Sequence, residues 1–369
     1  MTVVSGPVSA SSSNQRFFIV GGAGFLGSHF CDRLLAREGG AAAVTIYDNF
    51  SSGREWHFAH HAGDPRLRVV RGNAEDTVAL AAAMHGHDVV IHLASNPDIA
   101  RAAAEPTVDF YQGTVLTQSV LEAMRTTNAK RILYASGSGV YGELGTLDAR
   151  EDHGPLIPAS TYGASKLAGE ALIASYTAMF GVTGCVFRFG NVVGPRQTHG
   201  VGLDFARRLL QAAAAGEQLD SGTLGGFPNP PAAVRGEQSS PAPHATIALR
   251  VLGDGTQSKS YIHVEDVVRA VVTAQEKTAA RFATYNVATG DYITVREIAE
   301  LAVECVGLAP GSVRFDFTGG DRGWKGDVPI VRLNTDRIKT LGWRCERPSR
   351  EALRQSLLAM IPELRAGRL

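Results

Sequence analysis

Short apolar runs alternate with amphipathic stretches along the first half of the chain. The first apolar run, Phe17–Val20, ends at a glycine-rich turn, and residues Ser28–Glu38 continue with helical periodicity. Short apolar runs bounded by turn residues are typical of strands that are buried on both faces. The opening of the chain therefore predicts a strand, a glycine turn and a helix.

The same alternation predicts five more strands and three more helices before Asn191. The strands are Val44–Tyr47, Leu67–Val70, Asp88–Ala94, Lys130–Ser136 and Val182–Phe189, and the helices are Thr77–Met84, Thr107–Arg125 and Thr161–Phe180. Strands that alternate with helices form a parallel sheet covered by helices on both faces. The predicted fold class is therefore α/β with a doubly wound parallel sheet.

The alternation fades after Asn191, where a second region begins. Its predicted elements are helices Leu203–Ala215, Val264–Thr278 and Thr294–Gly307 and a short strand Tyr285–Val287. Residues 221–244 form a run that is rich in Pro, Gly and Ser and contains few apolar residues. Because such a run lacks anchors for a core, we expect a flexible surface insertion, with a lid over the substrate as the alternative.

Composition limits the partners of the chain. Its 369 residues include 36 Lys and Arg against 36 Asp and Glu, so no global field attracts nucleic acid or an anionic membrane. No apolar run reaches the roughly 18 residues of a membrane-spanning helix, so no membrane partner is expected. Residues 1–15 lack a basic segment and an apolar core, and we expect a disordered tail on a cytoplasmic protein.

The cysteines do not form a recognisable framework. Cys31, Cys185, Cys305 and Cys345 lie far apart, with no C-x-x-C pair and no Cys/His cluster. This pattern indicates neither disulfides nor a zinc site, and we expect reduced thiols and no metal.

The glycine-rich turn carries the first candidate chemistry. Gly21, Gly24 and Gly27 are spaced three apart, which allows a tight turn, close approach of a pyrophosphate, and close packing of the helix on the strand. A glycine turn without a ligand is the alternative, but Asp48 follows the second strand near the distance at which an acidic residue binds the adenosine ribose. A carboxylate there repels a 2′-phosphate, so the predicted cofactor is NAD rather than NADP.

A phenol and an ammonium group share one face of a predicted helix. Tyr162 and Lys166 are four residues apart within Thr161–Phe180. Tyrosine, with an ordinary pKa of about 10, is a poor base, but a fixed lysine and the positive charge of an oxidised nicotinamide stabilise the phenolate. A chance pair on an exposed helix is the alternative, which the dinucleotide turn disfavours. We therefore predict that Tyr162 takes a proton from a hydroxyl group.

Several motifs in a fixed order carry a family resemblance. They are Val20–His29, Tyr47–Asn49, Ile91–Ala94, Val140–Gly142, Tyr162 with Lys166, Gly190–Gln197 and Leu252–Gln257. With them, nearly everything after Gln15 resembles the extended short-chain dehydrogenase/reductase superfamily, and within it the NAD-dependent nucleotide-sugar epimerases and dehydratases similar to UDP-glucose 4-epimerase. The resemblance implies a Rossmann-type sheet domain that binds NAD and a smaller carboxyl-terminal substrate-binding domain.

The resemblance also implies a domain division and partners. Residues 16–191, to which 260–290 return, would form the NAD-binding domain; residues 192–259 and 291–369 would form the substrate-binding domain. The implied partners are a nucleotide sugar and a second copy of the chain. The homodimer would pair the two helices Thr107–Arg125 and Thr161–Phe180.

The resemblance assigns site residues in the same way. The implied cofactor-binding residues are Gly21, Gly24, Phe25, Leu26, Asp48, Asn49, Ser51, Ser52, Gly53, Asn73, Ala74, Leu93, Ala94, Ser95, Ser136, Tyr162 and Lys166; the implied substrate-binding residues are Asn191, Arg196, Lys259 and Arg322. Asn73 replaces an aspartate that meets adenine, and its side-chain carbonyl can still accept a hydrogen bond. Lys259 replaces a common arginine, so it keeps the charge but not the bidentate fork.

The chain departs from its family at Gly137. This glycine stands where the catalytic Ser or Thr is expected, so Ser138 or Ser136 would relay the proton, or Tyr162 would act alone; we favour Ser138. Dehydratases of the family carry an Asp-Glu pair at the positions of Ser138 and Gly139, and decarboxylases carry a glutamate at Gly139. Neither position is acidic here, which disfavours both reactions.

The predicted reaction is therefore epimerisation at C4 of a nucleotide sugar, through hydride removal, a 4-keto sugar and hydride return. Another reaction of the family, dehydration or 3,5-epimerisation, is one alternative. A non-catalytic NAD-binding regulator is the other, because Gly137 removes one expected catalytic group.

Overall fold

The structure, a computed structural model, describes residues 14–36, 40–96, 101–215, 247–324 and 326–369. The predicted insertion 221–244 and nearly all of the predicted tail lie outside the described residues.

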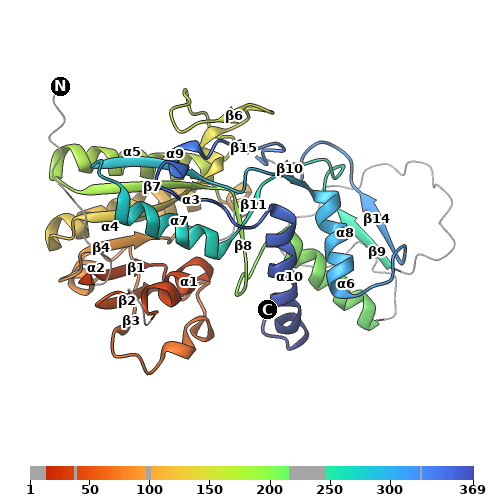
Figure 1. The fold of residues 1–369 in the computed structure, drawn as a ribbon, viewed down its shortest axis with the longest axis horizontal. Helices are drawn as coiled ribbons and strands as arrows, with labels where there is room; N and C mark the ends of the chain where they lie inside the picture. The colour runs from red at the N-terminus through yellow and green to blue at the C-terminus, as the bar shows by residue number, and fades with distance from the viewer. Residues whose placement is uncertain (1–13, 37–39, 97–100, 216–246, 325) are drawn as a thin grey trace.

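A parallel sheet of seven strands forms the larger part of the molecule (Figure 1). In spatial order its strands are β12 (Phe282–Val287), β7 (Thr183–Phe189), β5 (Arg131–Gly137), β4 (Val89–His92), β1 (Arg16–Val20), β2 (Ala43–Asp48) and β3 (Leu67–Arg71). The chain proceeds outward from β1 in one direction and then from β4 in the other, so the strand order reverses between β1 and β4. Ligands of such sheets bind beyond the carboxyl ends of the strands at this reversal. The predicted doubly wound α/β fold is confirmed.

Helices cover both faces of this sheet. On one face, α1 (Phe25–Leu34) and α7 (Val264–Lys277) pack in one apolar cluster with the strands. On the other face, α2 (Thr77–Met84), α4 (Leu116–Thr127) and α5 (Thr161–Phe180) form a second cluster. Both clusters consist of buried, mostly aliphatic and aromatic side chains, which explains why the inner strands are uninterrupted apolar runs in the sequence.

The segment Thr107–Arg125 is not the single helix that its periodicity predicts. It consists of α3 (Thr107–Asp109), a π-helical turn η5 (Phe110–Val115) and then α4. Gly113 in the wide turn packs against α5, since a Cβ atom there would lie 2.5 Å from the Ser165 hydroxyl oxygen. Close packing at one glycine therefore accompanies the widened turn, which a periodicity of 3.6 does not reveal.

The smaller part of the molecule has its own core. Helices α6 (Val201–Ala215), α8 (Val295–Val306) and α10 (Ser349–Arg365) pack with the parallel pair β9 (Ile247–Val251) and β14 (Val313–Phe317). Helix α8 starts at a capping box, in which Thr294 and Glu297 each bond the other's backbone amide. Helix α10, with Pro362 inside it, matches no element that the sequence predicted.

The remaining described elements are short. Three are strand pairs: β8 (Asn191–Val193) with β11 (Tyr261–His263), β6 (Asp148–Ala149) with β15 (Arg332–Leu333) and β10 (Ser258–Lys259) with β13 (Ile293–Thr294). The others are the helix α9 (Asp336–Lys339) and the 3-10 turns η2 (Glu55–His57), η3 (Ala59–His61), η4 (Arg101–Ala103) and η6 (Ser138–Tyr141). None of the described helices combines the length and the apolar character that crossing a membrane requires.

Candidate active site

A cavity of about 800 Å³ lies at the carboxyl ends of the sheet strands. Its lining joins the turn after β1, the ends of β2, β4 and β5, and the start of α5 to residues of α6, α10 and the segment before β15. The volume is in the range of sites for cofactors and small ligands. Both parts of the molecule therefore contribute to one site.

The glycine turn at one end of the cavity is shaped by close backbone contacts. Gly21 has a φ of 81°, and a Cβ atom on it would lie 2.7 Å from the backbone nitrogen of Ala94. A Cβ on Gly27 would lie 2.5 Å from the backbone of Gly22. Gly24 caps α1 without any side-chain hydrogen bond, and it lines the cavity. The first amides of α1 are therefore available to a phosphate group.

Asp48 ends β2 beside this turn. Its carboxylate accepts hydrogen bonds from the backbone amides of Phe50 at 2.7 Å and Ala23 at 3.0 Å. Burial raises the pKa of Asp48, and these two bonds oppose the shift. The side chain both fixes the glycine turn and lines the cavity, so it fits the ribose-binding role that its position predicts.

Exchanging Asp48 for Ser is expected to relax the choice between the two cofactors. The loss of a negative charge removes the repulsion of a 2′-phosphate, so the ratio of the NADP and NAD dissociation constants should fall about tenfold. Both constants can be measured by fluorescence titration on the two proteins. Equal affinity of the unmodified protein for NAD and NADP would contradict this role of Asp48.

Tyr162 and Lys166 line the cavity from the first turns of α5. Ser160 caps this helix, with its hydroxyl accepting from the Gly163 amide at 3.1 Å. The Lys166 ammonium donates to the Ala135 carbonyl at 2.8 Å and lies 5.5 Å from the centre of the Tyr162 ring. A carbonyl of β5 thus fixes the ammonium group beside the phenol.

The two groups have shifted pKa values. Burial lowers the pKa of Lys166 to about 8, against the charge of Asp109, so the ammonium form still predominates at pH 7. Burial raises the pKa of Tyr162, and the Ser95 side chain opposes that shift. The protein alone therefore keeps the phenol protonated, and the charge that would favour a phenolate must come from the oxidised cofactor.

The two serines at the end of β5, Ser136 and Ser138, have different surroundings. Ser136 is buried and donates to Glu170 at 2.6 Å, and Glu170 forms a buried ion pair with Arg188 at 2.7 Å. Ser138 begins η6 and lines the cavity. A Cβ atom added to Gly137 would meet no atom within 4 Å. The Ser136 hydroxyl is thus engaged in the interior, which leaves Ser138 as the better candidate.

The lining also includes polar residues from the chain after β7, which could bind a second ligand. Asn191 and Lys259, two of the predicted substrate-binding residues, are part of the lining. The Lys259 ammonium contacts the carboxylate of buried Asp327 at 2.5 Å, and Trp324 lies in the same part of the lining. A cation, an amide and an indole ring are suited to a nucleoside diphosphate.

Three predicted site residues do not line the cavity. Gly53 packs against Ala23 behind the glycine turn, where its added Cβ would lie 2.7 Å from the Ala23 Cβ. The Arg196 guanidinium is held by Asp32, by a ring nitrogen of His29 and by the His57 carbonyl. Arg322 contacts Glu143 at 2.6 Å and the Asp327 carbonyl at 3.2 Å. These contacts, which no sequence motif reveals, keep the two arginines from the cavity as the structure describes it.

The other predicted residues all line the cavity. They are Gly21, Gly24, Phe25, Leu26, Asp48, Asn49, Ser51, Ser52, Asn73, Ala74, Leu93, Ala94, Ser95, Ser136, Ser138, Tyr162, Lys166, Asn191 and Lys259. Sequence reasoning missed Gln197, His199, Tyr261, Trp324, Asp327 and the α10 residues Leu353, Leu357 and Met360. Usable signals existed for Gln197, which ends the motif Gly190–Gln197, and for Trp324 and Asp327, which follow Arg322 within five residues.

Three features occur together on this doubly wound sheet: a dinucleotide-binding turn, an acidic residue after the second strand and a Tyr/Lys pair. They define an NAD-dependent enzyme of the short-chain dehydrogenase/reductase type. The chain belongs to the NAD dependent epimerase/dehydratase family, whose sequence profile matches residues 17–288.

Its relatives include both epimerases and dehydratases. A UDP-glucose 4-epimerase from Mycolicibacterium smegmatis is 28% identical over 89% of this chain and 93% of its own length. A crystal structure of a UDP-galactose 4-epimerase is similar with a TM-score of 0.74 and 31% identity, covering 95% of this chain and 99% of that one. A dTDP-glucose 4,6-dehydratase from Streptomyces venezuelae, solved with NAD bound, has a TM-score of 0.77 and 25% identity, covering 94% and 96%. The cofactor of the protein is NAD, and the glycine turn and Asp48 fit it.

Proposed function

We propose that the protein is an NAD-dependent nucleotide-sugar 4-epimerase that acts on a UDP sugar. The observation that carries the proposal is the cavity lining around the end of β5 and the start of α5. It includes Ser138, Tyr162 and Lys166 but no acidic side chain at 138 or 139. The UDP-glucose and UDP-galactose 4-epimerases among the relatives support this choice of substrate class.

In this reaction each residue around the cavity would have a separate role. NAD, when bound, supplies an acceptor that takes a hydride from C4 of the sugar and later returns it to the other face. Tyr162 takes the proton of the C4 hydroxyl directly or through Ser138, and Lys166 supplies a positive charge that favours the phenolate. Asn191 and Lys259 hold the diphosphate, so that binding energy from the nucleotide leaves the sugar ring free to turn over.

The carboxylates of the lining argue against dehydration. In the described part of the cavity they are Asp48, Glu75 and Asp327. Asp48 bonds the glycine turn, Glu75 bonds Asn73 after β3, and Asp327 pairs with Lys259. Each is held by another group, and none belongs to the β5 end. Elimination of water needs an acid and a base beside the sugar ring, which these positions do not provide.

The decisive experiment incubates the purified protein with a panel of nucleotide sugars. Epimerisation gives a product of unchanged mass whose sugar proton at C4 has a different coupling pattern by NMR. Loss of 18 mass units would instead show dehydration and overturn the proposal. Absence of turnover with every nucleotide sugar, despite NAD binding, would favour a non-catalytic regulator.

We also propose that the protein is a homodimer. Four large apolar side chains are exposed on the two helical segments that the family resemblance pairs: Phe110 and Tyr111 on η5, and Met179 and Phe180 on α5. Phe110 and Tyr111 lie near the start of α5, and Met179 and Phe180 lie in its last turn. Large aromatic side chains and Met are enriched at interfaces relative to the rest of a protein surface. The double variant Phe110→Glu/Met179→Glu should halve the mass measured by light scattering, whereas the control Val78→Glu on α2 should not. A monomeric mass of the unmodified protein at micromolar concentration would contradict the proposal.

A further inference from the structure

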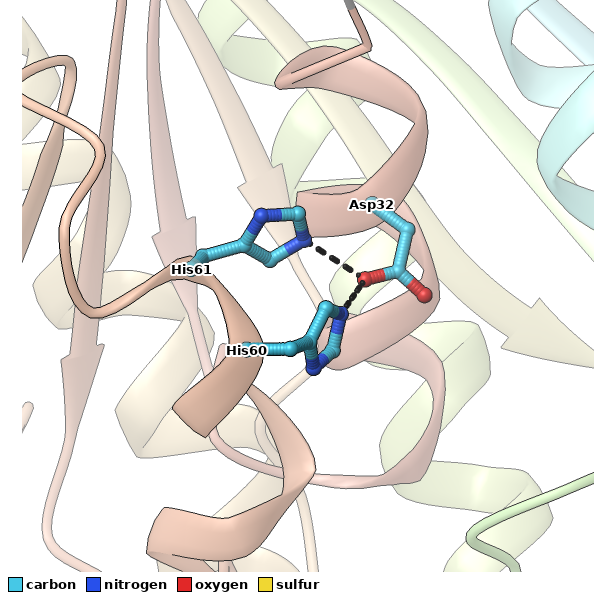
Figure 2. Close-up of side chains that lie close together, drawn as sticks. All are labelled: Asp32, His60 and His61. Carbon is cyan, nitrogen blue, oxygen red and sulfur yellow. Dashed lines mark hydrogen bonds and ion pairs between the residues drawn. The ribbon is translucent and has the colours of Figure 1, made fainter.

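Three metal-ligating side chains meet outside the cavity (Figure 2). His60 and His61 of η3 each place a ring Nε2 near the same oxygen, Oδ1 of Asp32 on α1, at distances of 2.7 and 2.8 Å. One ligand atom from each residue lies within 4.8 Å of the other two, and no other group of this kind occurs among the residues that the structure describes. None of the three lines the cavity.

We propose that Asp32, His60 and His61 bind one divalent transition-metal ion of the zinc type. Two imidazole nitrogens and one carboxylate oxygen form a donor set that zinc and its neighbours prefer, and three protein ligands leave a position for water. Bonds of about 2.0–2.2 Å around a tetrahedral ion separate its ligands by roughly 3.3 Å. The nitrogen–oxygen distances therefore need to open by only about half an ångström to admit the ion.

The surroundings of Asp32 orient the carboxylate for this task. Its other oxygen, Oδ2, is held by the Arg196 guanidinium, which also donates to the His57 carbonyl at 2.8 Å. A partner on the non-ligating oxygen fixes a metal-binding carboxylate in place. Burial raises the pKa of Asp32, but the Arg196 guanidinium and the hydrogen bonds of His61 and His60 together bring the pKa below its usual value, so the carboxylate is charged at neutral pH. The Arg196 charge also repels the ion, so we expect micromolar rather than tighter binding.

The exposure of the ligands allows an ion to enter. The His60 side chain is 52% exposed and that of Asp32 is 34% exposed, whereas the His61 side chain, at 17%, is largely fixed by packing. The hydrogen-bonded trio without an ion is the competing explanation, because each neutral imidazole can donate to Asp32 through Nε2.

The position of the site predicts an effect on stability. The loop that carries His60 and His61 is bonded to the glycine turn, since the His57 Nδ1 lies 2.8 Å from the Ala23 carbonyl and the Arg54 amide donates to the same carbonyl at 3.0 Å. Asp32 belongs to α1, the helix that follows this turn. A bound ion would therefore fasten the loop to α1 and raise the melting temperature.

The test compares variants that keep the hydrogen bonds but lose the metal ligands. In His60→Gln/His61→Gln the amide nitrogens can still donate to Asp32, but they do not coordinate zinc. The matched control is His85→Gln, at the exposed end of α2. Zinc binding to protein without an affinity tag is measured by calorimetry, and cobalt(II) is added as a probe whose visible absorption reports tetrahedral coordination.

The wild type and His85→Gln should bind one zinc ion per chain and melt at a higher temperature with zinc. The double variant should bind at least tenfold more weakly while it binds NAD as well as the wild type does. Equal zinc binding by the double variant, or no saturable binding by the wild type, would overturn the proposal in favour of the hydrogen-bonded trio. If the double variant does not fold, His60→Gln alone, at the half-exposed position, serves with the same outcomes.

Discussion

Replacing Tyr162 by Phe is expected to lower kcat by 10²–10⁴-fold, the range typical of a general acid–base group. The change removes one hydroxyl and no ring volume, so the packing of the first turns of α5 should stay intact. Lys166 keeps its bond to the Ala135 carbonyl in the variant, and the cofactor end of the cavity is untouched. NAD binding should therefore change little while turnover of the nucleotide sugar is lost.

The matched control is Tyr176→Phe, a chemically identical change on the same helix. The Tyr176 hydroxyl contacts Glu122 and Gln118 and does not line the cavity, so this variant should keep its kcat within about twofold. Retention of wild-type activity within about tenfold by Tyr162→Phe would mean that another group takes the proton. A similar loss in both variants would point to a structural effect on α5 instead.

The dependence of kcat/KM on pH provides a second test, because a purely structural defect would not change its shape. Burial raises the pKa of Tyr162, so kcat/KM of the wild type should rise with pH as the phenol ionises. Lys166, with a pKa of about 8, loses its charge as the pH rises above that value, and the support that it gives to the phenolate is lost there. The rate should therefore reach a maximum and then fall, and Tyr162→Phe should remove the rising limb.

The fold could be predicted closely from the sequence because the inner strands of its sheet are buried on both faces. Strand β7, for example, extends over Thr183–Phe189 against a prediction of Val182–Phe189. An apolar run bounded by turn residues leaves few other possibilities. Helix α10 and the π turn at Gly113 were missed since neither has such a signal: Pro362 interrupts one pattern, and the widened turn depends on contact with Ser165.

The site was predictable where one local motif fixes both position and role. Gly21, Gly24 and Asp48 lie beside one another because a strand end and a helix start bring them there. Arg196 could not be predicted in the same way, because its partner Asp32 is 164 residues away in sequence. The cluster of Asp32, His60 and His61 could not be predicted for the same reason: Asp32 lies on α1, and the sequence contains no Cys/His spacing that indicates zinc.

Replacing Ser138 by Ala is expected to lower kcat by about 10–100-fold, with little change in KM, if this hydroxyl relays the proton to Tyr162. Ser136 and Ser138 both line the cavity at the end of β5, but the Ser136 hydroxyl donates to buried Glu170. The matched control is Ser175→Ala, whose hydroxyl bonds only its own helix at the Ala171 carbonyl. That variant should be indistinguishable from the wild type.

The companion variant Gly137→Ser separates the relay from its competitor. A Cβ at this position meets no atom within 4 Å and the backbone is extended, with a φ of −157°, so the serine should fold without strain. If a hydroxyl is what the reaction needs, Gly137→Ser should keep or raise kcat and should restore part of the rate lost in Ser138→Ala. If the two glycines instead make room for a bulky sugar substituent and Tyr162 acts alone, Ser138→Ala should be nearly silent and Gly137→Ser should raise KM for the larger sugar. A silent Ser138→Ala is by itself enough to reject the relay, because a group that moves the proton in the transition state cannot be removed without cost to kcat.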